Sequence, residues 1–290
     1  MATLRDVKRK ISAVKKTQQI TRAMNMVAAA KLRTTQQQLT QFVPYATKLT
    51  EIMNRLAAGV APEGFPLLMA HEEVSKVEII SITADRGLCG GFNTNLIAAA
   101  ERLLNEKAQQ GLEVSLTTIG RKGRDYFRRR KVTRRDQHIG LLNRPNLQDA
   151  RMVGQKAIDL FSSHEVDEVY LSYARFINMA TQKPAVKKLL PIASDAAAGA
   201  EKEQIEYLFE PSLKGVLNDL LPNYVHLQLL EAFFQTAVSE HAARMTAMDN
   251  AVSNCKEMVR SLTLIYNKAR QAAITKELMD IVGGVEALKK

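Results

Sequence analysis

Both ends of the sequence carry long stretches in which apolar residues recur at alternating steps of three and four. In the N-terminal stretch the frame begins at Leu4 and Val7 and runs through a polar middle to Phe42. This spacing is typical of a coiled-coil seam, so it predicts a long helix over residues 1–58. The other seam positions are Ile11, Val14, Gln18, Thr21, Asn25, Ala28, Leu32, Thr35 and Leu39.

Glycine and proline set the expected ends of the helices. Neither residue occurs before Pro44, where we expect a kink, and residues 59–74 are predicted to form a linker. Asn223 to Val282 also lack both residues, which permits a helix of about 60 residues, roughly 90 Å long. We therefore predict a long helix over 223–283, preceded by a short helix over 211–221 that stops at Pro222.

The C-terminal stretch carries a second heptad frame. If both helices leave one side of the middle domain, they run in opposite directions and their seams pair as an antiparallel coiled coil. We expect this rod to stand on a globular base. The frame is Leu227, Leu230, Phe234, Ala237, His241, Arg244, Met248, Ala251, Cys255, Met258, Leu262, Ile265, Ala269, Ala272, Lys276 and Met279.

Between the helices the pattern changes to short β-branched and apolar runs that alternate with helical stretches. Strands are predicted over 77–83, 113–119 and 168–173, with a possible further strand within 183–192. Alternating strands and helices indicate a Rossmann-like α/β sheet domain over residues 75–192. The alanine-rich segment 193–209 is predicted to be a linker, and residues 210–290 form the C-terminal helices.

Composition narrows the classes of partner. The 290 residues carry a formal net charge of +11, which predicts an acidic partner such as a nucleic acid, an anionic membrane surface or an acidic protein. No apolar run reaches the roughly 18 residues that a membrane span needs, so we expect no direct membrane insertion. The N-terminus has no signal-peptide pattern, and the two cysteines have no metal-ligand spacing.

Two motifs suggest phosphate binding. The turn ADRGLCGGFN, Ala84 to Asn93, joins a strand to a helix but matches neither nucleotide-binding glycine motif, so a tight structural turn is the favoured interpretation. RRRKVTRR, Arg128 to Arg135, could bind phosphates, although a solvated face or loop is the more common explanation of such a run. No catalytic or metal motif is present, so we expect no active site, no cofactor and no metal.

Two surfaces on the helices call for partners. The N-terminal helix bears a basic stripe opposed by Asp6 alone, and an acidic partner or plain solvation would each explain it. The last turns carry an apolar tip, which would suit a hydrophobic sleeve or a fraying helix end. The stripe comprises Arg5, Lys8, Arg9, Lys10, Lys15, Lys16, Arg22, Lys31 and Arg33, and the tip comprises Ile274, Leu278, Ile281 and Val282.

Four blocks of sequence resemble one family closely. KRKISAVKKTQQITRAMNMVAAAKLR, ITADRGLCGGFN, SEHAARMTAMDNA and YNKARQAAITKELMDIVGG are similar to signature blocks of the gamma subunit of F-type ATP synthases. The likeness spans nearly the whole chain. It implies a bacterial-type, non-catalytic rotor subunit, peripheral on the cytoplasmic face of the inner membrane, that couples ion-driven rotation to ATP synthesis or hydrolysis.

The resemblance also implies partners. They are the ring of three alpha and three beta subunits, the epsilon subunit and the membrane c-ring, with no nucleic acid. Contacts to the beta subunits are implied for Met24, Arg244, Gln271, Thr275 and Glu277, and contacts of the base to epsilon and the membrane ring for Tyr207 and Glu210.

The sequence departs from the family pattern at Asn25, where many members carry a charge, and it lacks the cysteine-bearing segment of chloroplast members. A basic coiled-coil protein that binds nucleic acid is the alternative, and an α/β nucleotide-dependent enzyme is a third reading.

Overall fold

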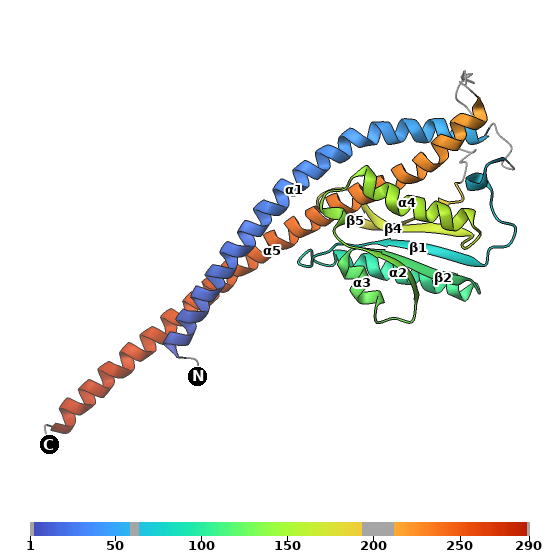
Figure 1. Cartoon of the computed structure of the whole chain (residues 1–290). Helices are drawn as coiled ribbons and strands as arrows, with labels where there is room; N and C mark the ends of the chain where they lie inside the picture. Colours follow the sequence, from blue (N-terminus) through green and yellow to red (C-terminus); the bar gives the residue numbers. More distant parts are fainter. Residues whose placement is uncertain (1–2, 59–63, 193–211, 289–290) are drawn as a thin grey trace. The chain divides into compact units, whose positions relative to one another are not determined.

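The computed structural model describes residues 3–58, 64–192 and 212–288 (Figure 1). Two compact units are present, one formed by residues 1–28 with 245–290 and the other by residues 29–244. The predicted linker 193–209, with Tyr207, lies outside the described residues, as do Glu210 and part of the linker 59–74.

Two long helices account for both ends of the chain. Helix α1 spans Leu4–Ala58 and continues through Pro44, and α5 spans Leu213–Leu288. The prediction of two helices separated at Pro222 was wrong, because Pro222 lies inside α5. The buried side chains of Leu221 and Tyr224 flank this proline, and their packing offsets the hydrogen bond that a proline removes.

Burial along α1 follows the predicted heptad frame. Val7, Ala28, Leu32 and Leu39 are buried, and the seam positions between Val7 and Ala28 are half-buried. In the first unit the amide of Asn25 donates a hydrogen bond of 2.9 Å to the carbonyl oxygen of Met245 on α5. The polar middle of the seam therefore contributes a direct bond between the helices.

After Met248 the predicted seam of α5 is only partly correct. Ala251, Cys255, Leu262 and Ala269 are half-buried, but Met258, Ile265, Ala272, Lys276 and Met279 are exposed. Met258 and Ile265 are each 52% exposed, whereas their neighbours Val259 and Tyr266 are half-buried. Apolar residues stand at both of the adjacent positions, so the sequence pattern alone cannot choose between them. The half-buried stripe runs through Val252, Cys255, Val259, Leu262, Tyr266, Ala269 and Ala273.

The second unit holds a five-stranded sheet of order β3-β2-β1-β4-β5. The first four strands in this order are parallel, and β5 runs antiparallel to β4. This order matches the Rossmann-like α/β class that the sequence predicted. The strands are β1 Lys76–Ile82, β2 Glu113–Ile119, β3 Thr133–His138, β4 Glu168–Phe176 and β5 Gln182–Leu190.

Strand β3 was not predicted. It begins at Thr133 to Arg135, whose side chains are exposed, so this part of RRRKVTRR is a solvated face and not a loop. It was missed because its sequence, TRRDQH, contains no apolar residue. An edge strand with mostly exposed side chains needs no apolar alternation, and charged side chains protect such an edge from unwanted pairing.

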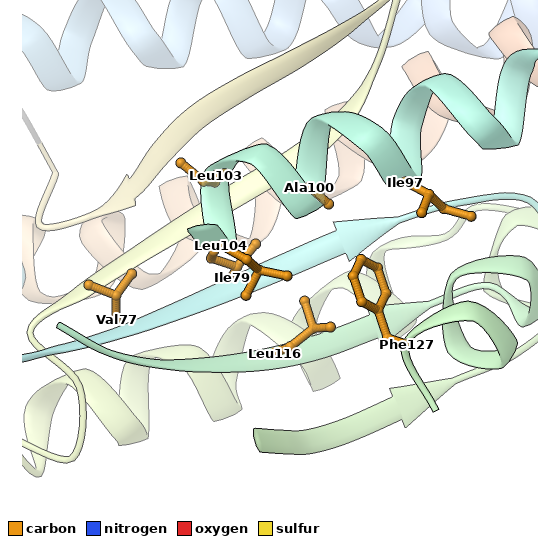
Figure 2. Close-up of a cluster of buried hydrophobic side chains, with 8 residues drawn as sticks. All are labelled: Val77, Ile79, Ile97, Ala100, Leu103, Leu104, Leu116 and Phe127. Atoms are coloured by element: carbon orange, nitrogen blue, oxygen red, sulfur yellow. The ribbon is translucent and has the colours of Figure 1, made fainter. Parts of the chain in front are cut away.

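Helices cover both faces of the sheet (Figure 1). Helices α2 Phe92–Gln109 and α3 Arg121–Phe127 lie on one face, and α4 Leu147–Ser162 lies on the other with the first part of α5. Figure 2 shows the core under α2, where Ile79, Leu104, Leu116 and Phe127 point toward one another. Short 3-10 helices lie at Pro66–Leu68 and Leu141–Asn143.

The first part of α5 is buried nearly all round. Between Tyr224 and Ala242, only Glu231 and Gln235 are not fully buried. Two of its side chains bond strand β4, since the Thr236 hydroxyl accepts from the backbone N–H of Ala174 at 3.2 Å and Gln235 accepts from that of Phe176 at 3.0 Å. The helix is thus an interior element of this unit.

Candidate interaction surfaces

The turn Ala84 to Asn93 is held by its own side chains. The Asn93 side chain accepts from the Ala84 N–H at 3.0 Å and donates to the Arg86 carbonyl at 3.1 Å. Asp85 accepts from the backbone N–H of Arg121, at the start of α3, at 2.9 Å. These bonds hold the turn from within and tie it to the start of α3, which favours the structural interpretation of the turn.

Arg244 joins this turn to α5. Its guanidinium donates to Glu240 Oε1 at 2.7 Å and to the Gly87 carbonyl at 3.1 Å, and its side chain is only 11% exposed. Burial raises the pKa of Glu240, and Arg244 opposes that rise. Burial likewise raises the pKa of the Cys89 thiol in the turn. Arg244 is therefore committed to contacts within the chain.

The basic stripe on α1 is open to solvent. All nine of its side chains are exposed, and none forms an ion pair with a carboxylate in the described ranges. Lys31 lies close enough to Glu240 to oppose, more weakly than Arg244 does, the rise in the pKa of that carboxyl that burial causes. The stripe is a positive surface whose charges are free for a partner.

The last turns of α5 expose apolar side chains. In the first unit α5 runs on past the start of α1 (Figure 1), so none of the described helices of this unit covers its end. Gln271, Thr275 and Glu277 are exposed in the same region, and Met24 is half-buried on α1. The exposed fractions in the tip are 54% for Ile274, 58% for Leu278, 67% for Ile281 and 50% for Val282.

A polar cluster was missed by the sequence reading. Glu78 on β1, Arg135 and Asp136 on β3 and Lys156 on α4 line a cavity under the sheet. The signal for it was Glu78 itself, a single acidic residue within the apolar strand KVEIISI. Within residues 3–58, 64–192 and 212–288, no group of His, Cys, Asp and Glu is arranged to hold a metal, and no helix could span a membrane.

The comparisons with known proteins agree over the full length. Residues 3–288 match the family model described as ATP synthase. The ATP synthase gamma chain of Syntrophobacter fumaroxidans is 60% identical, and that of Syntrophus aciditrophicus is 50% identical, each over 100% of both chains.

The chain belongs to the gamma-chain family of F-type ATP synthases. Solved structures share the fold of this chain at low identity. A chain of the Euglena gracilis mitochondrial ATP synthase, OSCP/F1/c-ring, is 23% identical with a TM-score of 0.68, and the match covers 98% of this chain and 94% of that one. A chain of the Tetrahymena thermophila central stalk and c-ring is 23% identical with a TM-score of 0.59, over 80% and 99%.

Proposed function

We propose that the chain is the central-stalk rotor subunit of the F1 sector of an ATP synthase. It couples ion-driven rotation of a membrane ring to conformational change at catalytic beta subunits. The observation that carries this proposal is the pair of long helices α1 and α5 in a gamma-family chain, with an unpaired basic stripe and an uncovered apolar tip.

The energetics of coupling explain why a long helical pair suits this role. One charge that crosses 100 mV supplies about 2.3 kcal/mol, so several translocations must accumulate for each ATP. A shaft that stores and passes on this work must be ordered along its length. Packed helices with a continuous seam meet this requirement better than a loop or a single isolated helix.

In this proposal the exposed surfaces of the two long helices contact the partner subunits. The basic stripe faces acidic parts of the beta subunits, which Met24, Gln271, Thr275 and Glu277 also contact. The tip from Ile274 to Val282 sits in a hydrophobic sleeve built by the alpha and beta subunits. Tyr207 and Glu210, outside the described residues, meet epsilon and the membrane ring. Arg244 contacts a beta subunit only by giving up, or sharing, its bonds to Glu240 and Gly87.

The chain has no active site of its own in this proposal and acts on the beta sites through contact alone. It lies peripherally on the cytoplasmic face of the bacterial inner membrane as part of F1. The turn Ala84 to Asn93 does not favour a nucleotide-dependent enzyme, since it matches neither nucleotide-binding glycine motif and is held by bonds of its own Asn93 side chain.

Reconstitution tests the proposal. The full-length chain is mixed with untagged alpha and beta subunits, and the complex is isolated at physiological salt and assayed for ATP hydrolysis. A stoichiometric complex is expected, whose activity needs the chain, while the chain alone is inactive. Lys15→Glu with Lys16→Glu should weaken assembly, because it reverses part of the basic stripe.

The matched control is Arg129→Glu with Lys131→Glu, which makes the same change in net charge at exposed positions of the sheet-bearing unit. It should assemble like the parent chain. Recovery of no complex, or equal losses in both variants, would contradict the proposal. Tight binding to duplex DNA that resists physiological salt would instead favour the nucleic-acid alternative.

A further inference from the structure

The connection from α3 to β3, residues 128–132, begins with a run of consecutive cations and projects from the second unit (Figure 1). Both of its ends are anchored. Phe127 before it is fully buried in the core under α2 (Figure 2), and Val132 at its end packs against the same core. The backbone N–H of Arg130 donates to the Phe127 carbonyl oxygen at 3.1 Å. The connection is therefore a tight turn that presents its side chains from a fixed backbone.

Arg130 holds this turn from within. Its guanidinium lies 5.0 Å from the centroid of the Tyr126 ring, donates to the Tyr126 hydroxyl at 2.7 Å and lies 3.4 Å from Glu101 on α2. The side chains of Arg128, Arg129 and Lys131 are exposed, and within residues 3–58, 64–192 and 212–288 they form no ion pair. These three neighbours of Arg130 thus keep their charge for a ligand.

Helix α3 adds a further cation beside the turn. Arg128 continues the helical backbone about two turns after Arg121, so the two side chains share a face. The pKa of Asp125 between them is lowered, chiefly by a hydrogen bond from Arg124 and also by the charges of Arg128 and Arg121. Arg124 thus engages the carboxylate on this face. The cations that remain, here named the arginine patch, are Arg121, Arg128, Arg129 and Lys131.

The density of charge in the patch favours a phosphate chain over an acidic peptide. Arg128, Arg129 and Lys131 leave the backbone within one tight turn. An extended peptide presents carboxylates on one side only at every second residue, roughly 6.6 Å apart, whereas a linear oligophosphate carries negative charge on each successive phosphorus. The planar guanidinium groups also match phosphate oxygens in pairs.

Other polyanions fit the turn less well. Single-stranded nucleic acid is bound through aromatic rings that stack on bases, but the Tyr126 ring is taken by the Arg130 guanidinium, and Phe127 is buried. Binding to an anionic membrane gains from apolar side chains that enter the lipid, but Val132 packs against the core instead. A soluble phosphate chain needs neither feature.

We propose that the arginine patch binds linear oligophosphates. Successive phosphates pair with Arg128, Arg129 and Lys131 at the turn, and Arg121 extends the patch along α3. None of these residues belongs to the basic stripe on α1 or to the apolar tip of α5, so the site does not depend on the contacts assigned to the rotor role.

Isothermal titration of the full-length chain with sodium tripolyphosphate, at physiological salt and without divalent cations, tests the site. Citrate and orthophosphate are titrated in parallel, because citrate carries several carboxylates and orthophosphate a single phosphorus. Tripolyphosphate should bind saturably, with affinity at least about tenfold above that of either control. No saturable binding of tripolyphosphate, or equal binding of citrate, would overturn the proposal.

The combined variant Arg128→Gln, Arg129→Gln and Lys131→Gln should weaken tripolyphosphate binding at least about tenfold. The matched control is Arg5→Gln, Lys8→Gln and Arg9→Gln, which removes the same charge from the basic stripe at exposed positions of α1 and should bind like the parent. Circular dichroism verifies the fold of both variants. Equal losses in the two variants would show that net charge alone attracts the anion, against the proposal.

Vesicles of phosphatidylcholine with phosphatidylglycerol distinguish a lipid headgroup from a soluble phosphate chain. The parent and the combined variant at residues 128, 129 and 131 should sediment with these vesicles to the same extent at physiological salt. Sedimentation that is lost in this variant, together with no binding of tripolyphosphate, would assign the patch to a membrane surface instead.

Discussion

Arg244 donates a hydrogen bond of 3.1 Å to the carbonyl oxygen of Gly87 and so fastens α5 to the turn after β1. The same guanidinium pairs with Glu240 one helical turn earlier, and the two side chains are 11% and 9% exposed. A buried ion pair contributes little compared with apolar packing, but the loss of one partner leaves a buried charge uncompensated.

Arg244→Ala should therefore lower the free energy of unfolding by roughly 3 kcal/mol. Urea denaturation of the full-length chain, followed by circular dichroism, measures this change. Adding Glu240→Gln to the variant should restore part of the loss, because it removes the stranded charge. A denaturation midpoint equal to that of the parent would show that the pair carries no stability.

Acid should weaken the chain through His241. Burial, with the nearby charges of Arg244 and Lys31, lowers the pKa of His241 to about 4, from 6.5. Between pH 4 and pH 6.5, His241 is therefore protonated in the unfolded chain but neutral in the folded chain. Stability is full above pH 6.5 and falls as the pH drops toward 4, by roughly 3 kcal/mol in total.

Thermal melts across this pH window check the prediction. His241→Gln should flatten the decline of stability with falling pH, whatever the absolute stability of the variant at neutral pH. His164→Asn is the control, because His164 is exposed and asparagine also tolerates its positive φ of 56°. An identical decline in parent and His241→Gln chains would exclude His241 as the cause.

Gly154 lets α4 pack closely on α5. A Cβ at this position would lie 2.6 Å from His226 Cδ2 and 3.1 Å from Leu229 Cδ1, both buried on α5. Gly154→Ala should therefore destabilise the chain by about 1–3 kcal/mol, despite the better helix propensity of alanine. Chemical denaturation gives the value.

Gly284→Ala is the matched control, since a Cβ there meets nothing within 4 Å. It should leave stability unchanged or raise it slightly. If both alanine variants behave alike, the close approach of the helices does not restrict residue 154.

Asn25 should stabilise the pairing of α1 and α5 in the first unit. Asn25→Ala removes its bond to the Met245 carbonyl and should cost about 1 kcal/mol. Hydrogen exchange at the amides of residues 4–28 measures the loss as faster opening. Gln19→Ala, at an exposed position of the same helix, should leave these rates unchanged, and equal acceleration in both variants would contradict the role of Asn25.

The parts of the fold that local patterns encode could be predicted. The heptad frame of α1 was correct because apolar residues at both of its ends, such as Val7, Leu32 and Leu39, share one register that continues through the polar middle. The seam of α5 was correct at Cys255 and Leu262 but wrong at Met258, where Val259 stands beside it. Strand β3 was missed because its sequence has no apolar residue. Pro222 was predicted to end a helix because the packing around it cannot be seen in the sequence.

The interaction surfaces could likewise be predicted only where a local pattern encodes them. The basic stripe and the apolar tip follow from helical spacing, and their side chains are exposed. The bond between Arg244 and Gly87 joins residues 157 positions apart, and the cavity beside Glu78 draws on three strands and a helix. Contacts of this range depend on the tertiary fold, which periodicity does not specify.

The burial of α5 between Tyr224 and Ala242 has a consequence for how the sequence can vary. A segment with hardly any face toward water has hardly any neutral position, so a saturation-mutagenesis map should show an almost unbroken intolerant block there. After Met248 only the seam is shielded, and the map should change to stripes that repeat every seven residues. Tolerance to substitution therefore rises along α5, from the buried segment to the segment in which only the seam is shielded.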